Sequence, residues 1–193
     1  LEINIMKYYY MCFDYNKGEM YNYIYCSKVD MHGLNEYVMV DGISLSQVWQ
    51  TADCFHNSRE FGTWSDFICN ATCFPIVSPK FVELTYDLLK NQAEFLDVTL
   101  TDEKDGSVTH GCKALNVLNV VDAIDFEHSD YSTIDFEGDI VYNVRKYAIF
   151  EEKVRNFDIF RLEKSRMLIF VSEKIKDIVC KNKLTGFYFK EIK

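Results

Sequence analysis

The 193-residue sequence predicts an α+β fold with a mixed sheet, and three features of the chain support this prediction. One pattern, an apolar run followed by Val-Ser-x-Lys, a helical stretch and a short strand, occurs twice in the C-terminal two-thirds and gives two strand–helix–strand units. Turn-forming residues separate β-prone runs nearer the N-terminus, which predicts hairpins. A dense β-branched run between the two units predicts a central strand. We expect residues 1–193 to form a single domain, with a variable part at 6–72 and a core at 73–193.

The N-terminal part is predicted to contain two hairpins. The first joins the aromatic-rich runs 8–15 and 20–27 through the turn-forming residues between them. The second is centred on Asp41-Gly42, because a two-residue hairpin turn needs residues that accept positive φ. Residues 46–70 keep no clean period, so we expect short helices and loops there. Met6 is a candidate start, and the residues before it are left out of the functional argument.

Each helix of the repeated units is predicted to begin after a serine. Ser78 precedes Pro79, which places Ser at the N-cap and Pro at the first helical position, where its missing N–H costs nothing. Ser172 precedes Glu173, whose charge suits a helix N-terminus, so we expect Ser172 to cap the second helix. The predicted apolar faces are Phe81, Leu84 and Leu88 in the first helix and Ile175, Ile178 and Val179 in the second. The second unit ends in a strand over 187–192.

The central run, residues 112–123, is predicted to be a strand, with a buried helix as the alternative. Carboxylates begin where this run ends: Asp122, Asp125, Glu127, Asp130, Asp135, Glu137 and Asp139. They alternate with the apolar residues Phe126, Tyr131, Ile134 and Phe136. We expect these carboxylates on a loop or at a strand end, within reach of solvent.

The net charge of −9 is concentrated in the middle of the chain. Residues 94–140 hold 12 acidic and 2 basic side chains, whereas residues 141–193 hold 7 acidic and 13 basic ones. Such a middle segment repels nucleic acid and attracts a basic protein. No apolar run reaches the roughly 20 residues of a membrane helix, and the N-terminus lacks a signal-peptide pattern. We therefore expect a cytoplasmic protein without a nucleic-acid or membrane partner.

The seven cysteines are odd in number and irregular in spacing, which favours free thiols in a reducing compartment. Two groups could be interpreted as zinc ligands: Cys69 and Cys73 with His56, or His110 with Cys112. Structural zinc sites usually contain two tight ligand pairs, and no second pair follows either group. We therefore expect no metal and no cofactor.

The acidic stretch permits three interpretations. Asp122 with Asp125, or Asp125 with Glu127, could act as an acid/base or metal-binding pair. However, the calcium-loop, phosphate-loop, dinucleotide and Ser/His/Asp patterns are missing from the sequence. A solvated acidic loop is the second interpretation, although it leaves the interleaved aromatic residues unexplained. The third is a surface for a cationic protein, with candidate partner-binding residues Glu127, Asp130, Tyr131, Glu137 and Asp139.

Five segments resemble, in order and spacing, one of the immunity-protein families of bacterial polymorphic toxin systems: FPIVSPKF, LNVLNVVDAIDFEHSDY, DIFRL, FVSEKIKDIV and LTGFYFKEI. The likeness runs over about residues 74–193. It implies a small cytosolic protein, encoded beside a secreted toxin, that binds the toxin domain and neutralises it by protein–protein contact. It brings no catalytic residues with it, so we expect a binding protein and not an enzyme.

Two other functions stay open from the sequence. One is a carboxylate- or metal-dependent hydrolase, and the other is a structural interaction domain without a toxin partner. The partner of an immunity protein with this charge would be a basic toxin domain. If the acidic stretch is not the interface, the N-terminal third offers Trp49, Phe61 and Trp64 as candidate anchors.

Overall fold

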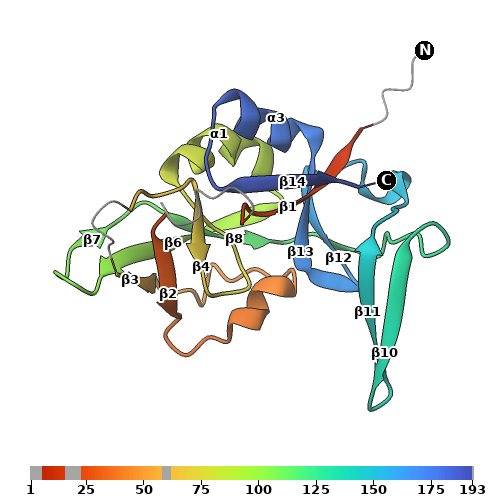
Figure 1. The fold of residues 1–193 in the computed structure, drawn as a ribbon, viewed down its shortest axis with the longest axis horizontal. Coiled ribbons are helices and arrows are strands. Elements are labelled where there is room, and N and C mark those ends of the chain that lie inside the picture. Colours follow the sequence, from red (N-terminus) through yellow and green to blue (C-terminus); the bar gives the residue numbers. More distant parts are fainter. Residues whose placement is uncertain (1–5, 16–22, 58–61, 193) are drawn as a thin grey trace.

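The computed structural model describes residues 6–15, 23–57 and 62–192, and three assemblies of strands organise this part of the chain. A closed barrel forms one half of the body, and a five-stranded sheet lies beside it. A two-stranded ribbon projects away from both (Figure 1). The fold is therefore α+β as expected, with more strand than helix.

Six strands close the barrel, and β7 (Val108–Thr109) flanks it on β6. The barrel strands, in spatial order, are β3 (Ala52–His56), β2 (Tyr25–Asp30), β4 (Phe67–Asn70), β5 (Ile76–Val77), β8 (Lys113–Val117) and β6 (Ala93–Asp102). Parallel pairing of β3 with β6, from Ala52 opposite Val98 onward, closes the ring. Small and sulfur-containing side chains, among them Cys26, Cys54 and Cys112, pack in one apolar cluster with Met39 of the 3₁₀ helix η2 (Glu36–Val40). Such residues fill the interior of a narrow barrel without overpacking it.

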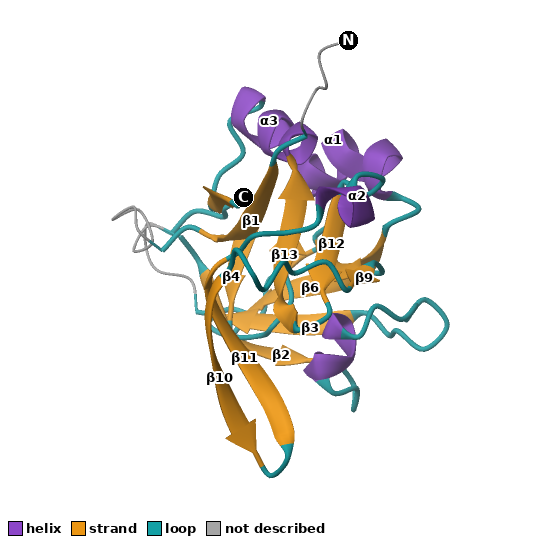
Figure 2. Ribbon diagram, turned by 90° about the vertical axis from the view of Figure 1, so that its right-hand side faces the viewer, coloured by secondary structure: helices purple, strands orange, loops and turns teal. Residues whose placement is uncertain are grey.

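The second sheet has five strands, and Figure 2 shows the helices α1 and α3 gathered together at one end of the body. In spatial order the strands are β14 (Phe187–Glu191), β1 (Tyr8–Phe13), β13 (Ser165–Ser172), β12 (Ile159–Leu162) and β9 (Val120–Val121). One apolar cluster joins this sheet to α1 (Pro79–Leu89), α3 (Glu173–Lys181) and the barrel strands. A second cluster on the sheet includes Val154 of the short helix α2 (Glu151–Val154).

The two predicted strand–helix–strand units are confirmed, and they share one design. The first consists of β5, α1 and β6, and the second consists of β13, α3 and β14. In each unit a strand from elsewhere lies between the two strands and runs antiparallel to both: β8 in the first unit and β1 in the second. The two strands of each unit therefore run parallel to each other, as a helical crossover requires. The single central strand predicted over 112–123 is confirmed in part, since the run forms two strands in different sheets, β8 in the barrel and β9 in the five-stranded sheet.

The helix–strand loop of each unit contacts the strand that borders the other unit. The N–H groups of Asp66 and Phe67, at the start of β4, donate to the carbonyl of Thr185 in the α3–β14 loop at 3.1 and 3.0 Å. The N–H of Asp158, just before β12, donates to Oε1 of Gln92 in the α1–β6 loop at 2.8 Å. Because β4 pairs with β5 and β12 pairs with β13, each loop is held beside the other unit.

The predicted cap of α1 is confirmed, whereas that of α3 is wrong in its chemistry. Ser78 accepts a hydrogen bond from the N–H of Phe81 at 3.2 Å, with Pro79 in the first turn. Ser172 has the extended backbone of an N-cap, but its side chain makes no capping bond. Its hydroxyl donates to the buried carboxylate of Asp158 at 2.6 Å.

Both N-terminal hairpin predictions are wrong. Strand β1 pairs with β13 and β14, and β2 pairs with β3 and β4, so the two runs belong to different sheets. The predicted turn at 16–19 lies outside the described residues. Around Asp41-Gly42 a turn does form, but the residues before it are the 3₁₀ helix η2, where Asn35 accepts a bond from the N–H of Tyr37 at 3.0 Å. A capped helical turn that buries Met39 replaces the expected strand.

The prediction of short helices and loops over 46–70 is wrong in part, since β3 and β4 lie there. In β3 every second residue is buried, and these residues are Ala52, Cys54 and His56. None of them has strong β propensity, so local sequence does not signal this strand. Among the described residues, no helix is long and apolar enough to span a membrane.

A projecting acidic ribbon as the candidate functional site

The candidate site is the ribbon formed by β10 (Asp130–Phe136) and β11 (Asp139–Lys146), which we call the arm. Its strands pair only with each other in the described structure. In both views the arm extends well beyond the body (Figures 1 and 2). A two-stranded ribbon is marginally stable alone, so the attachment of its base to the body matters. The sequence predicted solvent-exposed loop or strand ends here and did not anticipate a paired ribbon.

The base of the arm is fixed by aromatic and polar contacts. The ring of Phe126 lies 4.9 Å from that of Tyr131 and 4.8 Å from that of Tyr142, measured between centroids. Ser129 donates to the carbonyl of Ala148 at 3.2 Å, and the N–H of Ala148 donates to the Ser129 hydroxyl at 3.0 Å. These contacts hold the arm on both sides of its entry into the body.

The tip of the arm is a two-residue turn made by Glu137 and Gly138, between the opposed residues Phe136 and Asp139. Both turn residues have positive φ, 55° and 95°, as the twist of a tight hairpin requires. The N–H of Gly138 also donates to the carboxylate of Asp135 at 2.9 Å. The turn therefore projects Glu137 and Asp139 at the far end of the arm.

Three of the seven carboxylates are occupied by bonds within the fold. Asp130 forms a two-point ion pair with Arg145, at 2.6 and 3.1 Å, beside a bulge that displaces Arg145 from the strand register. This guanidinium holds the pKa of the Asp130 carboxyl below its ordinary value. Asp125 accepts bonds from two backbone N–H groups and from the ring of His128 at 2.7 Å, and the His128 bond lowers its pKa. Asp135 accepts a hydrogen bond from the N–H of Gly138 in the turn.

The other predicted partner-binding acids are uncommitted. Within the described chain, the carboxylates of Glu127, Glu137 and Asp139 have no hydrogen-bond or ion-pair partner, and all three residues are exposed. Residues 132–143 contain three acids and no Lys or Arg, so the outer part of the arm carries unneutralised negative charge. The structure thus brings Glu137 and Asp139 together at the tip, and Glu127 lies before the base.

The apolar residues of the arm lie on its two opposite faces. Opposed residues of an antiparallel pair share a face, and neighbours along a strand alternate. Tyr131, Tyr142 and Val144 therefore share one face, the Tyr142 face, where Phe126 covers the base. Ile134, Phe136 and Val141 share the other, the Ile134 face, and are 58, 67 and 52 % exposed. Tyr131, the predicted anchor, is less exposed and packs within the arm's base.

Ile140 and Val141 are also exposed, but they follow the last carboxylate of the stretch and were not predicted as site residues from the sequence. The signal for them was present. Glu137-Gly138 separates two runs of alternating character, which is a hairpin pattern even though Glu is unusual in the turn. Recognising that pattern would have placed β11 opposite β10.

A cavity of about 380 Å³ lies at the root of the arm, with Tyr10, Val144, Tyr147 and Leu168 in its wall. Its lining also contains three cations, Arg145, Lys146 and Lys190, and one acid, Glu191. The cations outnumber the acid, so the pocket matches a cationic partner less well than the tip does. We therefore place the candidate interface on the outer arm and not at its root.

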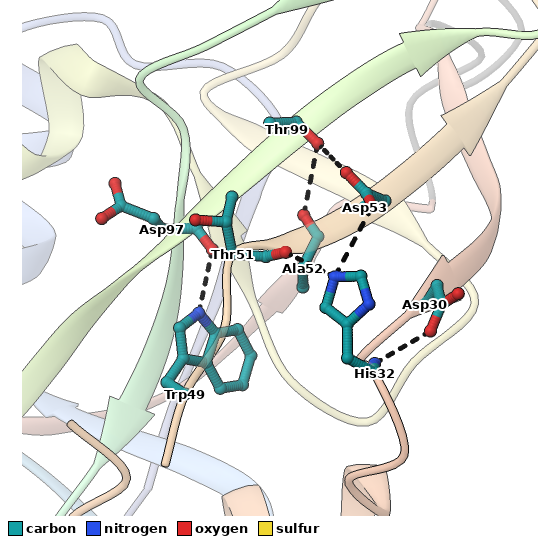
Figure 3. A network of polar contacts seen from close by, with 8 residues as sticks. All are labelled: Asp30, His32, Trp49, Thr51, Ala52, Asp53, Asp97 and Thr99. Carbon is teal, nitrogen blue, oxygen red and sulfur yellow. Dashed lines mark hydrogen bonds and ion pairs between the residues drawn. The ribbon is translucent and has the colours of Figure 1, made fainter. Parts of the chain in front are cut away.

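A polar network elsewhere in the molecule contains the residue types of a hydrolytic triad, His32, Asp53 and Thr99 (Figure 3). His32 lies 2.9 Å from the carbonyl of Thr51 and 3.6 Å from the carboxylate of Asp53, and the hydroxyl of Thr99 donates to the same carboxylate. In a hydrolytic triad the histidine stands between acid and nucleophile, but here the acid stands between the other two. Asp53 and Thr99 are opposed in the seam of β3 and β6, so the network closes the barrel.

The proposed zinc ligands are not brought together. His56 packs edge-on against Trp64 in the barrel, with centroids 4.7 Å apart, and Cys73 donates to the carbonyl of Glu36. Cys112 is buried, whereas His110 is exposed. No group of three metal-binding side chains, including one around Asp122, Asp125 and Glu127, occurs in the described residues. All seven cysteines are free thiols.

Two of the alternative anchors in the N-terminal third pack within the barrel. The indole N–H of Trp49 donates to the carbonyl of Asp97 at 2.9 Å, and Trp64 packs on His56. Both belong to the edge of the barrel's apolar cluster. Phe61, the third candidate, lies outside the described residues.

The chain matches the model of a known protein family. A family model described as "Immunity protein family (Imm11)" matches residues 27–193, which include every barrel strand except part of β2, all of the arm and the C-terminal unit. The match extends well to the N-terminal side of the likeness apparent from the segments between residues 74 and 193. None of the curated proteins matches the chain.

Proposed function

The chain belongs to the Imm11 immunity protein family, and from this premise we propose that it binds a cognate toxin domain and neutralises it by protein–protein contact. The observation that carries the proposal is the arm. It projects from the body, its outer part carries three acids without a cation, and its apolar side chains are uncovered. Exposed apolar residues bordered by charge are typical of a binding surface.

The charge of the arm supports a basic toxin domain as the partner. Glu127, Glu137 and Asp139 have no cation of their own in the described chain, so their field is directed outward. A field of this sign repels nucleic acid and accelerates encounter with a positively charged protein. The candidate interface therefore comprises Glu127, Glu137 and Asp139 for attraction, with Asp130 and Tyr131 supporting the base.

We place this activity in the cytosol of the producing cell. The seven thiols are free, and Cys26, Cys54, Cys69 and Cys112 are buried where no disulfide forms between them. Thiols that remain free across a chain of this size are typical of a reducing compartment. Burial raises the pKa of Cys69 and Cys112 to about 11, which keeps them protonated and unreactive.

The protein acts by binding and not by catalysis under this proposal. Both oxygens of Asp125 accept bonds from turn N–H groups and from His128, which is the bonding of a turn carboxylate. Among the described residues, Asp122, Asp125 and Glu127 do not form a group that could hold a metal ion. We therefore assign a binding role to this segment in preference to a hydrolase.

A shortened arm tests the function. Ile134 and Val141 are opposed two pairs below the pair that closes the native turn, so replacing residues 135–140 by Asn-Gly closes the ribbon one pair above Tyr142 of its aromatic base. The toxin domain encoded beside this chain's gene is produced in cells together with the wild type or with the shortened variant. We expect the wild type to protect the cells and the shortened protein to bind at least about tenfold more weakly, since exposed apolar anchors are lost.

A failure of the arm as the interface can be distinguished from a failure of the proposed function. The body of the shortened protein keeps its contacts, so its thermal midpoint should stay within a few degrees of the wild type. Protection by the shortened protein at the wild-type level would remove the arm from the interface. Failure of the wild type to bind or protect against the toxin would overturn the proposed function itself.

A further inference from the structure

On the basis of the proposed function, we propose that the Ile134 face of the arm is the docking surface for the toxin, and that it receives apolar side chains flanked by Lys or Arg. The surface consists of Ile134, Phe136 and Val141, with Asp139 beside them. Tyr131, the anchor expected from the sequence, lies on the opposite face of the arm.

The register of the arm separates its two faces. Ile134 is opposed to Val141, and Phe136 is opposed to Asp139, so these four side chains lie on one face near the tip. Each of the three apolar residues is more than half exposed. Three adjacent uncovered apolar side chains on one strand pair form a continuous strip, not isolated surface residues.

The Tyr142 face is already used by the protein itself. The rings of Phe126, Tyr131 and Tyr142 form a cluster with centroid distances between 4.8 and 6.0 Å. Val144, on the same face, packs against the apolar cluster of the five-stranded sheet. This face holds the arm onto the body, which leaves the Ile134 face open for a partner.

Charge decides between a toxin and a second copy of the chain as the occupant. Asp139 borders the strip, Glu137 lies in the adjoining turn, and residues 132–143 contain no cation. Two copies packed through this strip would bring their carboxylates together without a counter-charge, which is unfavourable. A partner with an apolar patch rimmed by Lys or Arg satisfies both the strip and the acids.

A matched pair of substitutions tests the face. Ile134 and Ile140 are the same residue, both 58 % exposed and both near the tip, but they lie on opposite faces. Ile134→Thr and Ile140→Thr therefore remove equal apolar surface and keep a β-branched side chain. The triple variant Ile134→Thr/Phe136→Thr/Val141→Thr removes the whole strip without changing the charge.

Binding is measured with the toxin domain encoded beside the gene, in a form inactivated in its own active site. We expect the triple variant to dissociate at least about tenfold faster, with an association rate within about twofold of the wild type, because steering charges are retained. Ile134→Thr should weaken binding about threefold or more, and Ile140→Thr should stay close to the wild type.

Three results would overturn the inference while leaving the proposed function intact, provided that the wild type binds the toxin. The first is a triple variant that dissociates at the wild-type rate. The second is an Ile140→Thr loss equal to that of Ile134→Thr, which would assign binding to the tip as a whole. The third is a wild-type dimer in sedimentation that the triple variant abolishes, which would make a second copy the occupant. A wild type that does not bind the toxin overturns both proposals.

Discussion

Ser78 and Ser172 occupy the same position in two related units, yet their hydroxyls make different bonds. Ser78 accepts from the N–H of Phe81 and donates to Asp66 at 2.7 Å. Ser172 donates to Asp158 and makes no cap bond. Asp158 and Ser172 are both buried, and Lys174 lies 3.2 Å from the same carboxylate. Removing a hydrogen-bond partner from a buried charge is costly, so Ser172 stabilises the fold through its bond to Asp158 and not by capping α3.

This difference predicts unequal costs. Ser78→Ala should lower the free energy of unfolding by about 1 kcal/mol, the usual loss for an N-cap. Ser172→Ala should lower it by roughly 2 kcal/mol, because it removes a bond to a buried carboxylate. Urea titration of both variants measures the two losses, and a double-mutant cycle of Ser172→Ala with Asp158→Asn measures their coupling. A smaller cost at Ser172, or no coupling to Asp158, would contradict the assignment.

At the scale of elements, the two strand–helix–strand units are held together by the loop before β14. The carbonyl of Thr185 accepts hydrogen bonds from the N–H groups of Asp66 and Phe67. The N–H and hydroxyl of Thr185 donate to the Asp66 carboxylate at 2.8 and 3.1 Å. Gly186 follows with a φ of 80° and lies directly against the chain that enters β4. A Cβ at this position would stand 2.7 Å from the carbonyl oxygen of Phe67. The Leu-Thr-Gly-Phe segment is therefore a junction between units.

Gly186→Ala should destabilise the protein by several kcal/mol in thermal or urea unfolding, because both the positive φ and the backbone contact oppose a methyl group. Gly33 is the matched control, with a φ of 90° and no atom within 4 Å of its added Cβ. Gly33→Ala should cost only about 1 kcal/mol, the strain of the backbone alone. Equal losses in the two variants would show that the junction tolerates a side chain.

The buried Arg161 gives another segment of the family likeness a structural role. It lies in β12, and its Nη1 donates to the carbonyls of Arg166 and Met167 at 2.5 and 3.1 Å. Burial lowers its pKa to about 10, so it keeps its charge at neutral pH. The Phe-Arg dipeptide thus ties β12 to the start of β13.

At the scale of the whole molecule, the charge is separated in space as well as along the chain. The arm's outer part is acidic, whereas cations line the cavity at its root. One apolar cluster contains residues of the barrel, both long helices and the five-stranded sheet. This shared core is the reason we propose residues 1–193 as a single domain, with the arm as its projecting part.

The position of the acids predicts how association responds to salt. Glu137→Lys/Asp139→Lys should slow binding of the basic toxin domain about tenfold at low salt and reduce the salt dependence of the rate. Glu83→Lys/Glu103→Lys, on α1 and after β6, changes the net charge by the same amount at a distance from the arm (Figure 1). Screening over roughly 8 Å at physiological salt should leave this control close to the wild type. Stopped-flow mixing over a salt series measures both, and equal slowing by the two variants would assign steering to net charge alone.

Elements whose signals are local can be predicted from the sequence. A serine followed by proline places the start of α1, the repeated Val-Ser-x-Lys pattern places both strand–helix–strand units, and the apolar run over 112–123 indicates β8 and β9. Helix caps, turns and apolar periods act over a few residues, so they can be read along the chain. The acidic stretch was recognised for the same reason, and five segments sufficed to indicate the family.

Strand pairing and the exposure of individual side chains depend on the folded structure. Strand β1 completes the C-terminal unit from the other end of the chain, and β3 closes the barrel with residues of weak strand propensity. Strand pairing is non-local, because a partner is chosen by burial on both faces and not by adjacency in sequence. The same holds for the candidate site. Arg145 pairs with Asp130 from the opposite strand, and Phe126 packs against Tyr131. Glu137, Asp139 and the Ile134 face are left exposed. The exposure of each side chain depends on which residues the fold brings next to it.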